Sequence, residues 1–231
     1  MHLHIISLFP EIFNSFLETS LLKKAQEKQI LSFSFINPRI FCTDKHQQID
    51  DQVYGGGAGM LIKAQPIIDS IEEIIKINNI KKSDFSIIFP SPSKDTFTQK
   101  QAYNFSKKQH LIFICGRYEG IDYRFEEYMK DHYPTEFQKI SLWQFILLWG
   151  EVATMTMIES ITRLIPGVIK ESESWQEESY SLKQGMTNLE HPQYTRPEEI
   201  YGYQVPSTLL SWNQKEIQQR RQENSVDNTE K

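Results

Sequence analysis

The chain carries, from residue 111 to residue 122, the stretch Leu111-Ile112-Phe113-Ile114-Cys115-Gly116-Arg117-Tyr118-Glu119-Gly120-Ile121-Asp122. Five apolar residues followed at once by a polar loop with two glycines are typical of a buried parallel strand and of the loop at its carboxyl end. Open parallel sheets bind ligands at that edge. The alternative is structural, with Gly116 and Gly120 making turns and Asp122 capping the next helix. The stretch therefore predicts a parallel sheet and leaves both roles of the loop open.

Strand-length apolar runs alternate with segments of helical periodicity over the first two thirds of the chain. Further strands are expected at residues 3–9, 30–36 and 85–89, and helices at residues 12–28, 65–77, 98–108, 123–130 and 151–163. This alternation predicts the α/β class with a mostly parallel sheet. We expect the main domain to cover residues 1–168, an acidic, serine-rich linker residues 169–185, and a small helical C-terminal domain residues 186–231.

Length, charge and cysteine content restrict the class of protein. With 231 residues, 39% of them apolar, the chain is long enough for one large globular domain and a small appendage. The formal net charge of −5 gives no overall basic field, so RNA binding would depend on local clusters. Two cysteines, and no apolar run near the roughly 18 residues of a membrane span, predict a soluble protein of the reducing cytoplasm with no membrane partner.

A second loop holds much of the glycine. The stretch Asp50-Asp51-Gln52-Val53-Tyr54-Gly55-Gly56-Gly57-Ala58-Gly59-Met60 contains four of the ten glycines. It is not a Walker phosphate loop, because Gly59 is followed by Met60 instead of lysine, and its glycine spacing does not fit the dinucleotide fingerprint. A ligand-binding loop and a surface Ω-loop whose glycines only permit turning remain equally open.

These two loops belong to a longer series of motifs in one order along the chain. The others are Ile5-Ile6-Ser7-Leu8-Phe9-Pro10-Glu11, Arg163-Leu164-Ile165-Pro166-Gly167-Val168 and Pro192-Gln193-Tyr194-Thr195-Arg196-Pro197. Together the motifs resemble the bacterial tRNA (guanine-N1)-methyltransferase family, TrmD, of the SPOUT class. Each motif alone is weak, but the ordered series covers nearly the whole chain and is highly specific.

The resemblance implies a methyl transfer from S-adenosyl-L-methionine to N1 of guanosine 37 in tRNA, next to the anticodon. It also implies a SPOUT-type parallel sheet with a deep trefoil knot, an exception to the usual rule against threaded chains, plus a small helical C-terminal domain. The implied assembly is a homodimer whose active site lies at the subunit interface. A Mg²⁺ requirement stays open, and no set of residues is singled out as a metal site.

The implied chemistry needs a base. N1 of guanine carries a proton, so it becomes a nucleophile only when a positioned group removes that proton. The resemblance assigns this role to Glu178, with Arg163 stabilising negative charge on the guanine oxygen and Glu119 facing the donor or the target base. Without the resemblance, Glu178 is one more solvated acid of an acidic linker.

The resemblance also implies residues for the methyl donor and for RNA. Three loops would hold the donor, mainly through backbone groups, at Pro90, Ser91, Pro92, Gly116, Tyr118, Ser141, Leu142, Trp143, Gln144, Phe145, Ile146, Leu147 and Gly150. The implied RNA contacts are His46, Asp50, Gly57, Gly59, Glu190 and Arg196. For the exposed basic residues, a solvated surface role is an equally open alternative to phosphate contact.

Some positions depart from the family's pattern. Trp143 and Trp149 stand where the family has glycine, as does Lys94 in the first donor loop, and Glu178 replaces an aspartate. A non-glycine residue held in left-handed backbone costs about 1 to 2 kcal/mol, and an indole can fill space meant for the donor. These differences motivate an alternative, a catalytically impaired paralogue that keeps the knotted fold and binds RNA or a protein partner without methyl transfer. A third interpretation is methylation of a different RNA.

Overall fold

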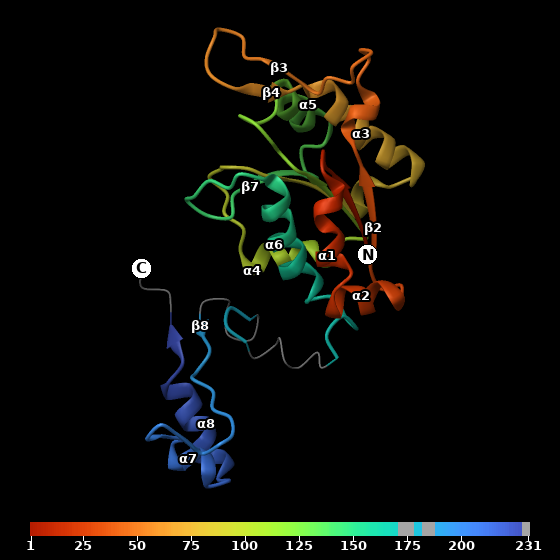
Figure 1. Ribbon diagram of the computed structural model, residues 1–231. Coiled ribbons are helices and arrows are strands. Elements are labelled where there is room, and N and C mark those ends of the chain that lie inside the picture. Colours follow the sequence, from red (N-terminus) through yellow and green to blue (C-terminus); the bar gives the residue numbers. More distant parts are fainter. Residues whose placement is uncertain (171–177, 182–187, 228–231) are drawn as a thin grey trace. The chain divides into compact units, whose positions relative to one another are not determined.

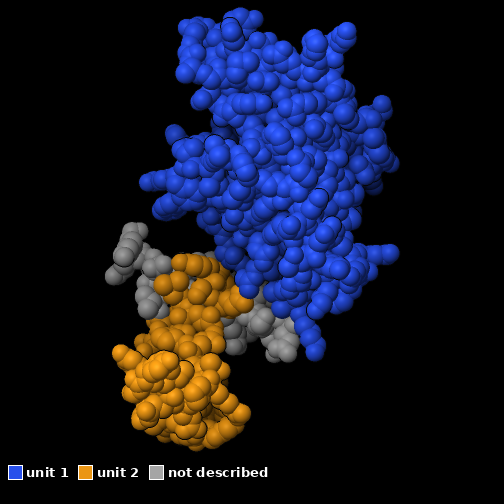
Figure 2. Space-filling model, viewed as in Figure 1, with its two compact units in different colours: residues 1–170 blue, residues 171–231 orange. Residues whose placement is uncertain are grey.

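The structure is a computed structural model that describes residues 1–170, 178–181 and 188–227 (Figure 1). The chain divides into two compact units, residues 1–170 and residues 171–231, which Figure 2 colours separately. In the part of the chain that is described, no helix is long and apolar enough to cross a membrane.

The first unit is built on a five-stranded sheet with the order β2-β1-β6-β5-β7. Its strands are β1 (His2–Ile6), β2 (Ser32–Ile36), β5 (Phe85–Pro90), β6 (His110–Ile114) and β7 (Phe137–Ile140). All neighbouring strands run parallel, which confirms the expected α/β class with a parallel sheet. The sequence did not predict β7, because two of its four residues are polar. As an edge strand with one neighbour, β7 needs less apolar surface than a central strand.

Helices cover both faces of this sheet (Figure 1). They are η1 (Pro10–Phe13), α1 (Asn14–Leu17), α2 (Ser20–Glu27), η2 (Pro38–Phe41), α3 (Ala64–Ile77), η3 (Lys82–Asp84), α4 (Gln99–Phe105), α5 (Arg124–His132) and α6 (Gly150–Thr162). The helices α3 and α5 pack against each other on one face, where Ile67, Ile71 and Phe125 join the apolar core. The helices α4 and α6 pack together, and α6 contacts β5 and β6.

The single helix expected at residues 12–28 is wrong, because the chain breaks there into η1, α1 and α2. Thr19 is extended and Ser20 has a φ of 49°, a left-handed conformation that ends a helix. Side chains stabilise the break: the Thr19 hydroxyl donates to the carbonyl of Ser15, and the Gln26 amide donates to the carbonyl of Leu17. A periodic apolar pattern continues across such a break and so cannot reveal it.

The second unit contains short elements. They are β8 (Asn188–Leu189), β9 (Glu199–Ile200), β10 (Tyr203–Gln204), α7 (Ser207–Leu210), α8 (Gln214–Glu223) and β11 (Val226–Asp227). The strands β9 and β10 pair antiparallel, as do β8 and β11, and α7 packs against α8. The helical content was expected from the sequence, and the two-residue strands were not. Among the described residues of this unit, Ile217 is the buried apolar side chain, so its core is small.

Candidate functional site

The glycine-rich loop is the end of a β-hairpin. The strands β3 (Asp50–Gln52) and β4 (Met60–Ile62) pair antiparallel on either side of it, and all four of its glycines have positive φ. Positive φ is the left-handed region that glycine adopts without steric cost. The Ω-loop interpretation is therefore replaced by a hairpin whose turn depends on its glycines.

This hairpin is joined to the loop that follows β6. The N–H of Ile62 donates to the carbonyl of Gly120 (2.9 Å), and the N–H of Asp122 donates to the carbonyl of Ile62 (2.9 Å). The Glu119 side chain lies directly against Gly59, because a Cβ added at Gly59 would be 2.4 Å from Cγ of Glu119. The two loops that the sequence singled out separately thus form one continuous structure.

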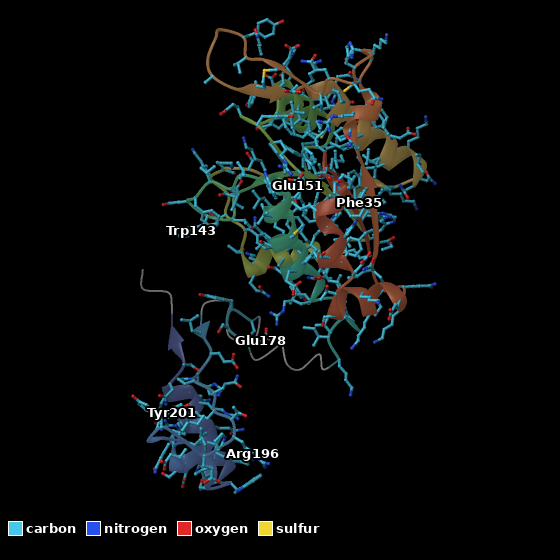
Figure 3. All side chains as sticks on the ribbon, in the orientation of Figure 1. Phe35, Trp143, Glu151, Glu178, Arg196 and Tyr201 are labelled. Atoms are coloured by element: carbon cyan, nitrogen blue, oxygen red, sulfur yellow. The ribbon has the colours of Figure 1, made fainter. Side chains whose placement is uncertain are left out.

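A cavity of about 420 Å³ opens at the carboxyl ends of β5, β6 and β7. Its walls come from the three loops that follow these strands. The expected donor residues that line it are Pro90, Ser91, Pro92, Gly116, Tyr118, Ser141, Leu142, Phe145, Ile146, Leu147 and Gly150. Within the described part of the chain, the lining does not include Trp143, which is 61% exposed (Figure 3), or Gln144.

Further residues line the cavity beside these. Arg117, Leu148 and Trp149 lie within the expected donor loops, Glu119 had been given a role of its own, and Phe89, Gly120 and Ala153 were not predicted. The sequence motifs could have indicated these residues as cavity residues, since most of them lie inside or next to the expected loops. Mostly apolar walls with a few polar groups, at this volume, are typical of a small-molecule or cofactor site.

The second and third cavity loops meet at Gly150. The N–H of Gly150 donates to the carbonyl of Gly116 (3.1 Å). A Cβ at Gly150 would lie 2.6 Å from the backbone nitrogen of Gly116, closer than real Cβ contacts. Glycine is therefore required at position 150 by the close approach of two backbones.

A buried ion pair joins the same two loops. Nε of Arg117 lies 3.0 Å from Oε2 of Glu151, whose side chain is fully buried. The hydroxyl of Ser7, just after β1, donates to Oε1 of Glu151 (2.7 Å). The Arg117 guanidinium also lies between two rings, 4.6 Å from the centroid of Phe9 and 4.7 Å from that of Trp149. Such cation–π contacts and the ion pair fix the loops relative to β1 and α6.

The backbone cost considered for the two tryptophans and for Lys94 does not arise. Trp149 has a φ of −133°, which is extended backbone open to any residue. Trp143 and Lys94 are not among the described residues with positive φ. Trp149 instead takes part in the Arg117 contact. Tyr118, which lines the cavity, is the non-glycine residue of these loops with positive φ, at 56°.

Two groups near the cavity have clear structural roles. Asp122 accepts the backbone N–H of Arg124, the first residue of α5, and the Arg124 side chain lowers the pKa of its carboxyl. The predicted N-cap role of Asp122 is therefore wrong by one residue, because Asp122 lies just before the N-cap position of α5. Complete burial raises the pKa of the Cys115 thiol far above its usual range, so Cys115 is not a thiolate nucleophile.

Arg163 lies far from the cavity of its own unit. Gly150 begins α6 at the cavity and Arg163 follows its last residue. A helix rises about 1.5 Å per residue, so this 13-residue helix separates the two ends by about 20 Å. The structure therefore brings Glu119 to the cavity of its own chain but does not bring Arg163 there.

The remaining expected residues lie on the glycine hairpin or in the second unit. Asp50 is half-buried in β3, whereas His46 and Gly57 are exposed. In the second unit, Glu178 is half-buried and Arg196 is exposed (Figure 3), and the N–H of Glu190 donates to the hydroxyl of Ser179 (2.9 Å).

Fold and site together define a parallel α/β protein with a cofactor-sized cavity at the carboxyl ends of three neighbouring strands. A family model described as tRNA (Guanine-1)-methyltransferase TrmD matches residues 1–231. The chain belongs to this family.

Similar proteins named tRNA (guanine-N(1)-)-methyltransferase support the assignment. The one from Carboxydothermus hydrogenoformans is 46% identical over 229 residues, which are 99% of this chain and 84% of the relative. The relative from Bacillus velezensis is 42% identical over 229 residues, covering 99% of this chain and 89% of its own length. The relative from Clostridioides difficile is 42% identical over 226 residues, with coverages of 98% and 93%.

Proposed function

We propose that this protein is a tRNA (guanine-N1)-methyltransferase that transfers a methyl group from S-adenosyl-L-methionine to N1 of guanosine 37. The observation that carries the proposal is the cavity built from the three donor loops, in a chain that belongs to the TrmD family throughout its length. Trp149 lines this cavity and is held by Arg117, so the substitution leaves a cavity in place. The impaired paralogue loses the backbone-strain argument that supported it.

The donor would occupy the cavity against the loops at Pro90, Gly116 and Ser141. It would supply the electrophilic methyl group. Backbone groups of these loops bind and orient the adenosine, and the apolar side chains at positions 145–149 exclude water from it. Exclusion of water strengthens the polar contacts inside such a site.

We assign the proton transfer to Glu178. Its carboxylate would take the proton from N1 of guanine while Arg163 stabilises the charge that develops on the guanine oxygen. Glu119, in the cavity and against Gly59, is placed to contact the target base or the donor. The hairpin residues His46, Asp50, Gly57 and Gly59, with Glu190 and Arg196, would bind the tRNA.

A homodimer would complete the active site. The distance between Arg163 and the cavity of its own chain, about 20 Å along α6, supports an active site at the subunit interface, where Arg163 of one protomer serves the cavity of the other. We also propose the trefoil knot and a cytoplasmic location, both of which rest on the resemblance to the SPOUT class. A dependence on Mg²⁺ belongs to the same proposal.

A transfer assay tests the function. The purified chain is incubated with methyl-labelled S-adenosyl-L-methionine and an unmodified tRNA transcript that has guanosine at position 37. The matched control transcript has adenosine there. We expect label only in the guanosine transcript, and loss of at least about a hundredfold in rate for Glu178→Ala, since a general base contributes at least that much. Background incorporation in both transcripts would refute the proposal, and equal labelling of both would show a different RNA target.

A further inference from the structure

Three histidines lie together at the amino-terminal end of the sheet, the end opposite the cavity. His2 and His4 are on β1, and His110 begins β6, where it pairs in register with His2. Because strand side chains alternate between faces, residues two apart on β1 and the partner of His2 on β6 share one face. No metal site was expected from the sequence.

The spacing of their ring nitrogens fits one small cation. One ring nitrogen from each histidine lies within 4.8 Å of those from the other two. Nε2 of His4 and Nδ1 of His110 are hydrogen-bonded at 3.1 Å, a bond that a cation between them would replace. Two nitrogens bound tetrahedrally to one zinc ion at about 2.0–2.1 Å are about 3.4 Å apart. His4 and His110 thus already have the spacing of two ligands, and the cluster would contract by about 1.4 Å at most.

The other ring nitrogen of His4 has the partner that metal-binding histidines usually have. Nδ1 of His4 is 2.8 Å from the hydroxyl of Ser34 on β2. When Nδ1–H donates to Ser34, the lone pair of Nε2 faces the cluster, an arrangement that orients a ligand and fixes its tautomer. Nε2 of His2 is buried and finds no hydrogen-bond partner among the described residues. A bound cation would satisfy this nitrogen.

The surroundings of all three imidazoles favour the neutral form, which is the form that binds metals. Burial, together with the neighbouring His2 and His110, lowers the pKa of His4 to about 3. Burial also lowers the pKa of His2 and of His110. The charged groups that face the cluster are the amino group of Met1, which lowers the pKa of His2 and His110, and Asp84, which opposes that shift at His110.

We propose that His2, His4 and His110 form a binding site for one late first-row divalent cation, of the zinc and cobalt kind, that links β1 to β6. Imidazole ligands suit these metals, whereas Mg²⁺ prefers oxygen. The rings of His2 and His4 are stacked at 18°, so His2 has to turn to direct its lone pair at the ion. His2 is half-buried, so its ring is not enclosed on all sides. The site is separate from the proposed methyl transfer and does not depend on it.

A titration of the full-length chain, stripped with EDTA and dialysed, tests the site. Zn²⁺ binding is measured by calorimetry and Co²⁺ binding by visible absorption. We expect one equivalent of either ion, together with a higher melting temperature. Ser34→Ala should weaken binding about 10- to 100-fold, the usual effect of losing the partner of a metal-bound histidine. His110→Asn should weaken it at least as much.

His132→Asn is the matched control, because His132 is an exposed histidine of α5 outside the cluster. The Zn²⁺ and Co²⁺ affinities of the His132→Asn variant should equal those of the unchanged chain. His2→Asn provides a second variant at a half-buried position in case His110→Asn does not fold, as checked by circular dichroism. No binding by the unchanged chain would overturn the proposal. So would unchanged affinity in the folded cluster variants, which would place the ion elsewhere.

Discussion

Replacing Gly150 by alanine should push apart two of the loops that form the cavity and so weaken donor binding, and the structure gives the size of the effect. A Cβ at Gly150 would lie 2.6 Å from the nitrogen and 2.9 Å from the oxygen of Gly116, both backbone atoms that cannot rotate away. At Gly116 the same methyl group would meet a ring carbon of Phe89 at 3.3 Å. Gly116→Ala is therefore a matched control, the same change in the same cavity against a softer neighbour.

The clash has to be set against a gain. Ordinary contacts begin near 3.4 Å, so the third loop must move by about 0.8 Å, and overpacking of this kind costs about 1–3 kcal/mol. Alanine gains about 1 kcal/mol over glycine in a helix interior, but position 150 is the first residue of α6 and recovers only part of this. A clash of about 2 kcal/mol, the middle of the range, therefore leaves a cost of about 1–2 kcal/mol, which weakens donor binding about 5- to 30-fold.

Calorimetric titration with S-adenosyl-L-methionine measures this directly. The expected order of affinity is the unchanged chain, then Gly116→Ala within about threefold, then Gly150→Ala at least about fivefold weaker. Urea unfolding of the unchanged chain and of both variants shows whether the lost free energy is confined to the cavity or destabilises the whole unit. Equal affinities for Gly150→Ala and the unchanged chain would refute the claim that these two loops form the donor site.

Three more predictions follow from named contacts. Arg117→Met leaves the buried carboxylate of Glu151 unpaired and should lower the free energy of unfolding in urea by about 3–5 kcal/mol, whereas a loss below about 1 kcal/mol would show that the pair is not buried. Trp149→Gly should lower that free energy by about 1–2 kcal/mol, through lost stacking on Arg117, and should not raise donor affinity, because Trp149 carries no left-handed strain; tighter donor binding would contradict this. The pKa of His4, about 3 when folded against an ordinary 6.5, implies stability that is present above pH 6.5 and is lost as the pH falls from 6.5 toward 3. His4→Gln should flatten this part of the pH profile of urea unfolding, and an unchanged slope would show that His4 does not titrate as described.

The local sequence pattern was sufficient to predict part of the fold and part of the candidate site. The stretch from 111 to 122 predicted a buried strand and a loop at its carboxyl end, where the cavity lies, because both depend on residues next to one another. The break at Ser20 and the edge strand β7 were missed, since one depends on a single left-handed residue and the other on pairing with one neighbour. Only tertiary structure could show the bond between Ser7 and Glu151, which joins residues 144 positions apart.

The loops that line the cavity were found through motifs, whereas their distance from Arg163 was not. The motif at 163–168 follows the third donor loop closely in sequence, but α6 carries Arg163 about 20 Å from the cavity. Sequence order alone gives no measure of this separation, which depends on the length of one helix. The same limit hid the histidine cluster, whose members come from two strands more than a hundred residues apart.

The most direct test of the proposed function is the identity of the modified nucleoside. A single-turnover reaction with S-adenosyl-L-methionine and an unmodified tRNA transcript is digested to nucleosides and separated by liquid chromatography with mass detection. We predict 1-methylguanosine, up to one per tRNA, and none when guanosine 37 is replaced by adenosine. Absence of 1-methylguanosine from a reaction in which the protein binds the donor would contradict the assignment.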